Sequence, residues 1–372
     1  MHAYPELSFI EYNTSAFVKA RLDEMGIPWN AIANTGVVAI VKGALPFDKV
    51  IALRADMDAL PITEANQTGY ASQHEGIMHA CGHDAHTSSL LGTAHILQSI
   101  KHRFGGTVKL IFQPAEEKLP GGAGIMIKEG VLEDPRPQCV IGQHVMPSIE
   151  CGKIAIGKGK LMASMDELLV TVKGKGGHGA QPQQNIDPVL IASHIVIALQ
   201  QIVSRMANPT NPTVLSFGKF IADGAVNVIP DTVYMEGTFR TLNERWRNEA
   251  HIQMKKMATG IAESMGGSCE FIINRGYPFL INEEQLAGHV GRFAGEYLGK
   301  ENIIDPGVWM ASEDFAFYSQ VTDCCFYFLG TGNSTKGIVS SLHTPTFDID
   351  EDALALSTGL MAYIAVRQLG NE

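Results

Sequence analysis

The stretch TVKLIFQPAEE, from Thr107 to Glu117, holds a short apolar run that ends in two adjacent glutamates. A continuous apolar run of this length is typical of a strand buried on both faces of a parallel sheet. Three more runs of the same kind predict further strands, at residues 36–41, 50–54 and 139–143. Functional groups gather at the carboxyl ends of strands in such sheets, so the two glutamates are candidates for chemistry.

Helical patterns alternate with these strands. One helix is predicted over Thr14–Met25, before Gly26, and another over Asp84–Ile100. The inner face of the first helix is predicted to carry four apolar residues, Phe17, Val18, Leu22 and Met25. The inner face of the second is predicted to carry Leu90, Leu91, Ala94 and Leu97. This alternation predicts an α/β domain with a mixed, mostly parallel sheet covered by helices.

The pattern changes near residue 165. Strand, helix, strand, strand, helix and strand follow in turn, over 167–173, 188–206, 213–220, 232–239, 244–265 and 268–274. This is the order of the ferredoxin-like split unit. Asp187 is the expected N-cap of the first of these helices, with Pro188 at its first position. A predicted helix over 283–298 and a predicted strand over 325–329 resume the α/β alternation of the first 165 residues. We therefore predict one domain of residues 1–165 plus 276–372, interrupted by an inserted domain of 166–275.

The densest chemical cluster is HACGHDAH, from His79 to His86. Thiolate and imidazole ligands suit zinc or a similar late first-row metal. Cys81 and His83 are spaced for a tight turn at Gly82, just before a helix. Asp84 is the expected N-cap of that helix and could also orient a ligand.

Other candidates follow predicted strands. Glu116 and Glu117 cannot both be free charges at low cost, but a metal on one and a proton-transfer role for the other would resolve this. His144 follows the strand 139–143, and His343 lies in a polar loop. Asp56 and Asp58 follow the strand 50–54 and could hold a ligating histidine.

The inserted domain offers three further candidates. His178 lies in the glycine-rich turn KGKGGHGA, and Asn227 and Arg240 follow in VNVIP and EGTFRT. Arginine is the natural bidentate partner of a substrate carboxylate. Taken without context, each of the three fits a structural role better than a functional one.

In this order, HACGHDAH, FQPAEE, GQHV, KGKGGHGA, VNVIP, EGTFRT, ASEDFAFY and LHTPTFD resemble the M20 metallopeptidase family over nearly the whole chain. The resemblance is to its amidohydrolase branch, which includes N-acyl-amino-acid amidohydrolases (aminoacylases), hippurate hydrolases and indole-acetyl-amino-acid hydrolases. It implies a catalytic α/β domain that holds two divalent metal ions (Zn, Mn, Ni or Co) and an inserted lid or dimerisation domain.

The resemblance also implies residue roles. The metal ligands would be Cys81, His83, Glu117, His144 and His343. Glu116 would be the general acid/base, and His178 would stabilise the oxyanion, in some relatives from the partner subunit. Asn227 and Arg240 would hold the substrate carboxylate. Other branches carry a histidine at the place of Asp56, oriented by Asp58; here Cys81 and His83 would replace it. The motif with Glu313 and Asp314 recurs without an assigned role.

The sequence is compatible with three functions. The first is a metal-dependent hydrolase that splits N-acyl amino acids into a carboxylic acid and a free amino acid, with a dipeptidase or aminopeptidase of the same family as the alternative. The second uses Cys81 as a metal-free nucleophile. The third is a metal-storing or ligand-binding protein without turnover.

Composition narrows the partners and the compartment. The formal net charge is −11, with 45% hydrophobic and 18% charged residues, which argues against nucleic acid or an anionic membrane as the main partner. Six cysteines without paired spacing favour a reducing compartment, and we expect a cytoplasmic protein. The first residues show no signal-peptide pattern, and no run of about 18 apolar residues predicts a membrane helix. The expected partners are a small N-acyl amino acid or peptide-like substrate and a second copy of the chain, through the inserted domain.

Overall fold

The computed structural model describes residues 1–370 of the chain. The internal contacts divide it into two compact units. The first unit takes in Met1–Leu161, Ile281–Val308 and the chain from Glu313 onward. The second takes in Met162–Leu280 and Trp309–Ser312. The second unit is thus a few residues longer at each end than the predicted insertion, and it includes a short downstream segment that the sequence pattern did not assign to it.

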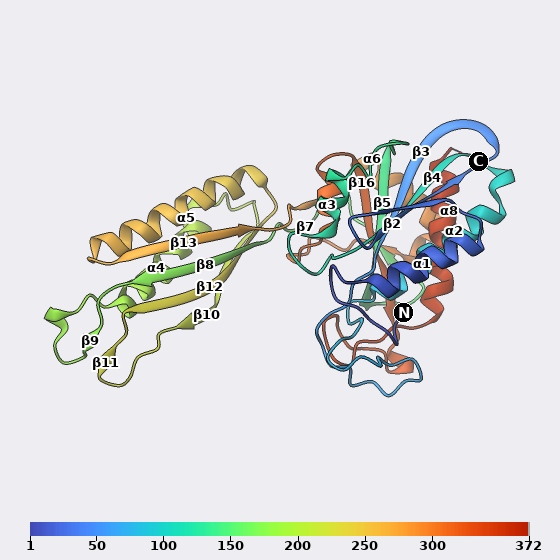
Figure 1. Cartoon of the computed structure of the whole chain (residues 1–372). Helices are drawn as coiled ribbons and strands as arrows, with labels where there is room; N and C mark the ends of the chain where they lie inside the picture. The colour runs from blue at the N-terminus through green and yellow to red at the C-terminus, as the bar shows by residue number, and fades with distance from the viewer. Residues whose placement is uncertain (371–372) are drawn as a thin grey trace. The chain divides into compact units, whose positions relative to one another are not determined.

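The first unit is built on an eight-stranded sheet in the order β1-β2-β4-β3-β5-β16-β6-β15 (Figure 1). These strands are β1 (Trp29–Ile32), β2 (Gly36–Lys42), β3 (Leu45–Asp56), β4 (Gly105–Gln113), β5 (Cys139–Glu150), β6 (Ile154–Ala155), β15 (Ile303–Ile304) and β16 (Asp323–Gly332). The four central strands β4, β3, β5 and β16 run parallel, and antiparallel pairs occur towards both edges. The predicted α/β class with a mixed, mostly parallel sheet is confirmed.

Helices cover this sheet. They are α1 (Tyr12–Glu24), α2 (His83–Ser99), α3 (Gly122–Lys128), α6 (Glu284–Leu298), α7 (Ala316–Ser319) and α8 (Asp352–Gln368), with single 3₁₀ turns at η1 (Lys101–Arg103), η4 (Lys300–Asn302) and η5 (Ser334–Lys336). α2 packs on α1 and α8, and α8 packs on α6, so these four form one layer, whereas α3 and α7 contact each other. α8 was not predicted, although Leu360, Met361 and Ile364 on it are buried in the main core.

Two predicted details of the first unit are wrong. Phe17 does not face inward: it is 39% exposed, while Val18 and Leu22 are fully buried. Val18 and Leu22 are four residues apart and share one helix face, and Phe17 lies about 100° away from Val18 around the axis. The strand that was predicted to end before His144 continues to Glu150, so His144 lies inside β5, opposite Phe328 of β16.

The second unit has a four-stranded antiparallel sheet in the order β10-β12-β8-β13. Its elements are β8 (Asp166–Lys173), α4 (Pro188–Gln201), η3 (a π-helical turn, Ile202–Met206), β10 (Thr213–Ile221), β12 (Thr232–Thr241), α5 (Glu244–Ser264) and β13 (Ser268–Arg275). Element order and strand order together are those of a ferredoxin-like unit. Short elements complete the chain: β7 (Gly159–Met162), β9 (Gly177–His178), η2 (Pro182–Gln184), β11 (Val228–Ile229) and β14 (Leu280–Asn282).

The helix α4 begins as predicted. Asp187 is its N-cap and accepts hydrogen bonds from the backbone N–H groups of Val189 and Leu190. The helical segment Pro188–Met206 is long and apolar enough to cross a membrane by length and composition only, and 28% of its apolar 18-residue window is buried. Ile191 and Ile195 of this helix pack into the core of the second unit.

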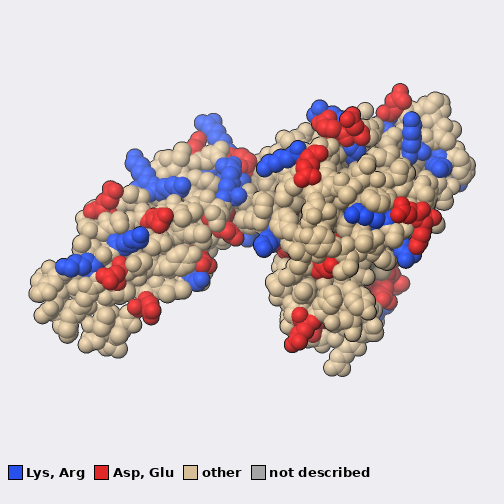
Figure 2. All heavy atoms as spheres, viewed as in Figure 1, with Lys and Arg blue, Asp and Glu red and all other residues tan. Residues whose placement is uncertain are grey.

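Charged side chains of both signs are interspersed over the face of the molecule in Figure 2. The formal net charge of −11 is therefore not gathered into one acidic patch on that face.

Candidate active site

The turn before α2 carries Cys81 and His83. Gly82 between them has a φ of +77°, in the left-handed region. A Cβ built on Gly82 would lie 2.5 Å from Cγ2 of Val145. Both the conformation and the close approach require glycine here. Gly82 is also the N-cap of α2, which begins at His83, so the prediction that Asp84 caps this helix is wrong: the left-handed glycine turns the chain into the helix earlier.

The thiol of Cys81 meets two histidines from distant segments. Its Sγ lies 3.3 Å from Nε2 of His144 on β5 and 3.3 Å from Nε2 of His343. His343 has a φ of +60°, and its backbone N–H donates to the carbonyl of Ala80, 2.8 Å away. The loop of His343 is thereby tied to the residue next to Cys81.

Glu117 completes the cluster. Its Oε1 lies 3.3 Å from Nε2 of His343 and 3.8 Å from Nε2 of His83. Potential ligand atoms of Cys81, His83 and His144 all lie within 4.8 Å of one another, and so do those of Cys81, Glu117 and His343. The structure therefore brings all five predicted ligands together, with Cys81 common to two overlapping groups of donors.

The two buried histidines are oriented with one ring nitrogen towards the cluster. Nδ1 of His83 is 3.2 Å from Oδ1 of Asp58, and Nδ1 of His144 is 2.7 Å from the carbonyl oxygen of Val145. A neutral ring that donates from Nδ1 keeps its lone pair on Nε2, which is the form that binds metals.

Two buried atoms in this cluster make no hydrogen bond within residues 1–370, although ion-pair contacts of 3.3 and 3.8 Å reach them. They are Nε2 of His83 and Oε1 of Glu117. An unpaired buried polar atom is costly, so buried polar atoms normally find a partner. A cation between these donors would provide one, and the set of one thiol, three imidazoles and a carboxylate suits a late first-row divalent metal. The residues present therefore fit the metals that the sequence implies.

Asp58 ties the predicted ligand His83 to the two glutamates. Its carboxylate accepts hydrogen bonds from the backbone N–H groups of Glu116 and Glu117, at 3.0 and 2.9 Å, and from the hydroxyl of Ser8 at 2.6 Å. Burial raises the pKa of Asp58, but the hydrogen bond from His83 and these other donors outweigh burial, and the net shift is downward. Asp58 is therefore held as an anion that fixes both the imidazole and the backbone of the glutamate pair.

Glu116 is buried beside the cluster. Burial raises its pKa well above the ordinary value, and the negative charges of Glu313, Glu117 and Asp314 raise it further. Its Oε1 accepts a hydrogen bond from the backbone N–H of Asp314 at 3.3 Å. A buried carboxyl group beside a cluster of metal-type donors is placed to exchange a proton with a group bound there.

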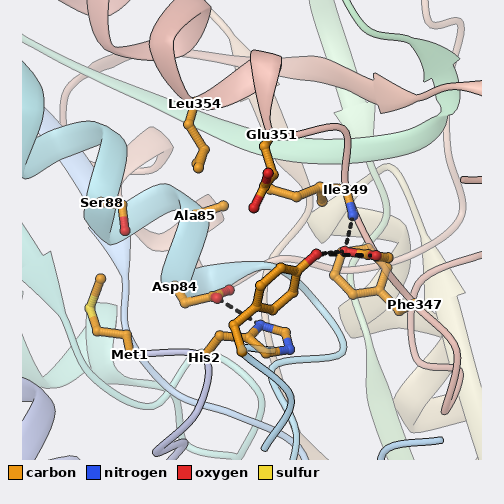
Figure 3. Close-up of a pocket in the computed structure, with 11 residues that line it drawn as sticks. Met1, His2, Asp84, Ala85, Ser88, Phe347, Ile349, Glu351 and Leu354 are labelled. Carbon is orange, nitrogen blue, oxygen red and sulfur yellow. Dashed lines mark hydrogen bonds and ion pairs between the residues drawn. The ribbon is translucent and has the colours of Figure 1, made fainter. Parts of the chain in front are cut away.

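Asp84 does not contact a predicted ligand. Its carboxylate lies 2.8 Å from Nδ1 of His2, as the dashed line in Figure 3 shows. The pocket drawn there has a volume of about 260 Å³, and none of the five predicted ligands lines it. Of the two carboxylates expected to orient a ligand, only Asp58 contacts one.

The sequence reasoning missed the buried arginine beside the site. Arg54 on β3 is fully buried and donates to Gln113 (2.9 Å), Asp56 (2.5 Å), Glu313 (2.9 Å) and Asp314 (2.8 Å). This explains the motif of Glu313 and Asp314, to which the sequence assigned no role. A charged residue inside an otherwise apolar strand was the available signal, because such residues are almost never buried without partners.

His86 was quoted within the histidine cluster but given no role. Its Nδ1 lies 2.6 Å from Oδ1 of Asp56, and its Nε2 accepts a hydrogen bond from the backbone N–H of Val145 at 2.8 Å. Asp56 therefore holds His86, and His86 holds the residue next to His144. Both ring nitrogens of His86 are therefore used in hydrogen bonds that fix the backbone beside the proposed ligand His144.

The structure places His178, Asn227 and Arg240 in the second unit. His178 is on β9 and pairs with Val228 of β11. Asn227 lies close to it, because its carbonyl accepts a hydrogen bond from the backbone N–H of Gly179 at 2.8 Å. Arg240, on β12, donates to the carbonyl of Met310 at 3.0 Å. The structure thus brings His178 and Asn227 together, and Arg240 has a backbone partner of its own.

Known proteins resemble this chain along its length. The family model described as peptidase family M20/M25/M40 matches residues 52–367. The chain is 40% identical over 370 residues to the N-acetyl-L-cysteine deacetylase of Bacillus subtilis, which covers 99% of this chain and 86% of that protein. It is 43% identical over 286 residues to the N-acyl-L-amino acid amidohydrolase of Geobacillus stearothermophilus, covering 77% of this chain and 76% of that protein.

A solved structure shares the architecture. The YXEP protein of Bacillus subtilis, described as a dinuclear metal binding peptidase, superimposes with a TM-score of 0.84 at 34% identity. The match covers 100% of this chain and 96% of that one.

Proposed function

Because this chain belongs to peptidase family M20/M25/M40 and is a metal-dependent hydrolase of amide bonds, we propose that its substrates are N-acyl amino acids, which it splits into a carboxylic acid and a free amino acid. The family resemblance stated from the motifs is thereby confirmed, and a metal-storing protein without turnover is set aside. The observation that carries the proposal is the buried Glu116 directly beside five converging metal-type donors.

The proposed site holds two divalent ions through Cys81, His83, Glu117, His144 and His343. When bound, such ions supply the Lewis acidity that activates a water molecule and polarises the amide carbonyl. Glu116 takes a proton from the attacking water and returns it to the leaving nitrogen.

The second unit would supply the remaining groups. His178 would donate a hydrogen bond to the negative charge that develops on the carbonyl oxygen. Asn227 and Arg240 would bind the substrate carboxylate, for which a guanidinium group is the natural partner. A His178→Ala variant is the simplest test of its part: unchanged kcat in a fully metal-loaded variant would refute it.

Removing the metal is expected to abolish hydrolysis. We expect chelator-treated protein to lose activity on N-acyl amino acids and to regain it, to different extents, with Zn, Mn, Ni or Co, because each suits a site of S, N and O donors differently. Turnover and bound metal per chain are measured together, with Glu117→Gln as a variant expected to bind less metal.

Full activity in protein shown to be metal-free would instead favour Cys81 as a nucleophile. Against that alternative, burial raises the pKa of the Cys81 thiol well above its ordinary value, and the thiol is a poor nucleophile when protonated. Activity is also measured on free dipeptides, which carry a free amino group. Faster hydrolysis of dipeptides than of N-acyl amino acids would favour the aminopeptidase or dipeptidase alternative.

We also propose that two copies associate through the second unit. β10 is an edge strand of its sheet, and Phe220 and Ile221 on it are 43% and 45% exposed. Leu190 and Ile197 on α4 are exposed as well. An apolar edge strand is suited to pairing with a second copy across a two-fold axis.

Sedimentation at micromolar concentration is expected to give a dimer, and an Ile221→Lys variant is expected to be mostly monomeric. A wild-type protein that sediments only as a monomer would rule the dimer out.

The cytoplasmic location is supported by six cysteines that form no disulfide in the structure, and cell fractionation would test it.

A further inference from the structure

We propose that Glu11 is a positioning residue for Glu116, and that it acts by holding Ala115 in a left-handed backbone conformation. The inference rests on the proposed role of Glu116 as the general acid/base. It concerns a residue that is far from the metal donors in sequence and lies outside the motifs described above.

Ala115 is the feature that needs explaining. It is fully buried and has a φ of +52°, in a region that residues with a Cβ rarely adopt. It lies directly before Glu116, so its conformation sets the direction in which the Glu116 side chain leaves the backbone. A non-glycine residue keeps such a conformation only where the surrounding structure enforces it.

Glu11 supplies part of that enforcement. Its side chain is fully buried, and its Oε1 accepts hydrogen bonds from the backbone N–H groups of Ala115, at 2.8 Å, and Phe9, at 2.9 Å. Its Oε2 accepts from the hydroxyl of Thr35 at 2.6 Å. Although Glu11 is the N-cap residue of α1, its side chain makes no capping hydrogen bond to that helix. One carboxylate oxygen therefore binds the loop before Glu116, and the other binds Thr35.

The other contacts of this loop complete the same arrangement. The carbonyl of Ala115 accepts a hydrogen bond from the backbone N–H of Gly122 at 2.8 Å. The next two N–H groups, of Glu116 and Glu117, donate to Asp58. Three consecutive backbone N–H groups thus donate to two buried carboxylates, and Glu11 holds the first of them.

The chemistry of the contact calls for a carboxylate. The backbone N–H groups of Ala115 and Phe9 can only donate, and an ionised carboxylate is an acceptor at both oxygens. The side-chain amide of Glu11→Gln carries no charge, so its hydrogen bonds to these N–H groups are weaker than those of a carboxylate. The variant keeps the size of the side chain, so it weakens these hydrogen bonds without opening a cavity.

The test compares four proteins: Glu11→Gln, Ala115→Gly, the double variant and Glu6→Gln. Glu6 is the matched control, because it is another buried carboxylate of the same segment. Among the described residues, its carboxylate accepts hydrogen bonds from Asn13 and Thr14, at the start of α1. We measure kcat and KM on an N-acyl amino acid with metal-loaded protein, and hydrogen exchange of the peptide that covers 113–118.

We expect Glu11→Gln to lower kcat at least tenfold with little change in KM, and to speed exchange in 113–118. We expect the double variant to recover part of kcat, because glycine adopts a left-handed conformation without the Cβ penalty. Glu6→Gln should leave both readouts at the wild-type level.

Unchanged kcat and exchange in Glu11→Gln would overturn the inference, and so would equal losses in Glu11→Gln and Glu6→Gln. A wild-type protein without hydrolytic activity would refute the proposed function. In that case the exchange data alone decide whether Glu11 holds the loop.

Discussion

Glu116→Gln is expected to lower kcat by about 10²–10⁴-fold while the protein keeps its metal. Glutamine matches the size of glutamate but cannot take a proton from water or return one to the leaving nitrogen. Glu116 is not one of the five proposed ligands, so its replacement leaves the donor set complete. Turnover and bound metal per chain are measured on the same preparation.

The neighbouring glutamate provides the matched control. In Glu117→Gln a proposed ligand is weakened, so activity and bound metal should fall together, and excess metal should restore part of the activity. Excess metal should not restore Glu116→Gln. Wild-type turnover in fully metal-loaded Glu116→Gln would remove Glu116 from the mechanism.

Arg54→Met is expected to destabilise the protein by about 3–5 kcal/mol, the usual effect of breaking a buried ion pair. The guanidinium group is the common partner of Asp56, Glu313 and Asp314, all of which are buried. Without it, Glu313 and Asp314 remain in the core without the guanidinium group that pairs with them, and Asp56 keeps only its contacts with His86 and His83. Urea unfolding of metal-free protein measures the loss, because bound metal would add its own stabilisation.

Lys109→Met is the matched control for this effect. Lys109, on the adjacent strand β4, is also a buried cation, but its ammonium group donates to the backbone carbonyls of Val131 and Glu133, at 2.9 and 2.5 Å. Its loss leaves no buried carboxylate behind, so we expect a smaller effect, of about 1–3 kcal/mol. Equal losses in the two variants would show that the carboxylates around Arg54 do not matter.

The pH dependence of Arg54→Met follows from the same cluster. Burial raises the pKa of Glu313 to about 8 and that of Asp314 to about 6, although Arg54 opposes both shifts. A folded-state pKa above the unfolded one means that folding takes up a proton, so stability falls as pH rises through that interval. Removing Arg54 raises both values further. The destabilisation in Arg54→Met should therefore be larger at pH 8 than at pH 5.

Local patterns predicted much of this architecture. Each of the six elements of the ferredoxin-like segment was found to within a few residues, because helical and strand periodicity are properties of neighbouring residues. The five converging donors were also found, since each lies in a short motif. The inner face of α1 was misassigned at Phe17, because a helix of mixed composition offers more than one plausible apolar stripe.

The supporting network could not be found in the same way. Arg54 contacts Glu313 across 259 residues of sequence, and Glu11 contacts Ala115 across 104. Nothing near either residue in the chain indicates its partner. A buried charge is understandable only once the partners that neutralise it are known, and these are set by the packing of the sheet and its loops.

The place of β16 in the large sheet has a consequence for biosynthesis. β16 lies between β5 and β6, yet it is made after the whole second unit, from Asp323 onward. At roughly 5–20 residues per second, a ribosome needs about ten seconds or longer to pass from the end of β5 to β16. During that time the apolar edge of β5 has no partner, and such an edge is prone to pair with other chains. The proposed ligand His343 is made later still. A nascent chain of this protein therefore passes through a long stage in which the second unit is finished and the sheet that carries the proposed catalytic groups is still open.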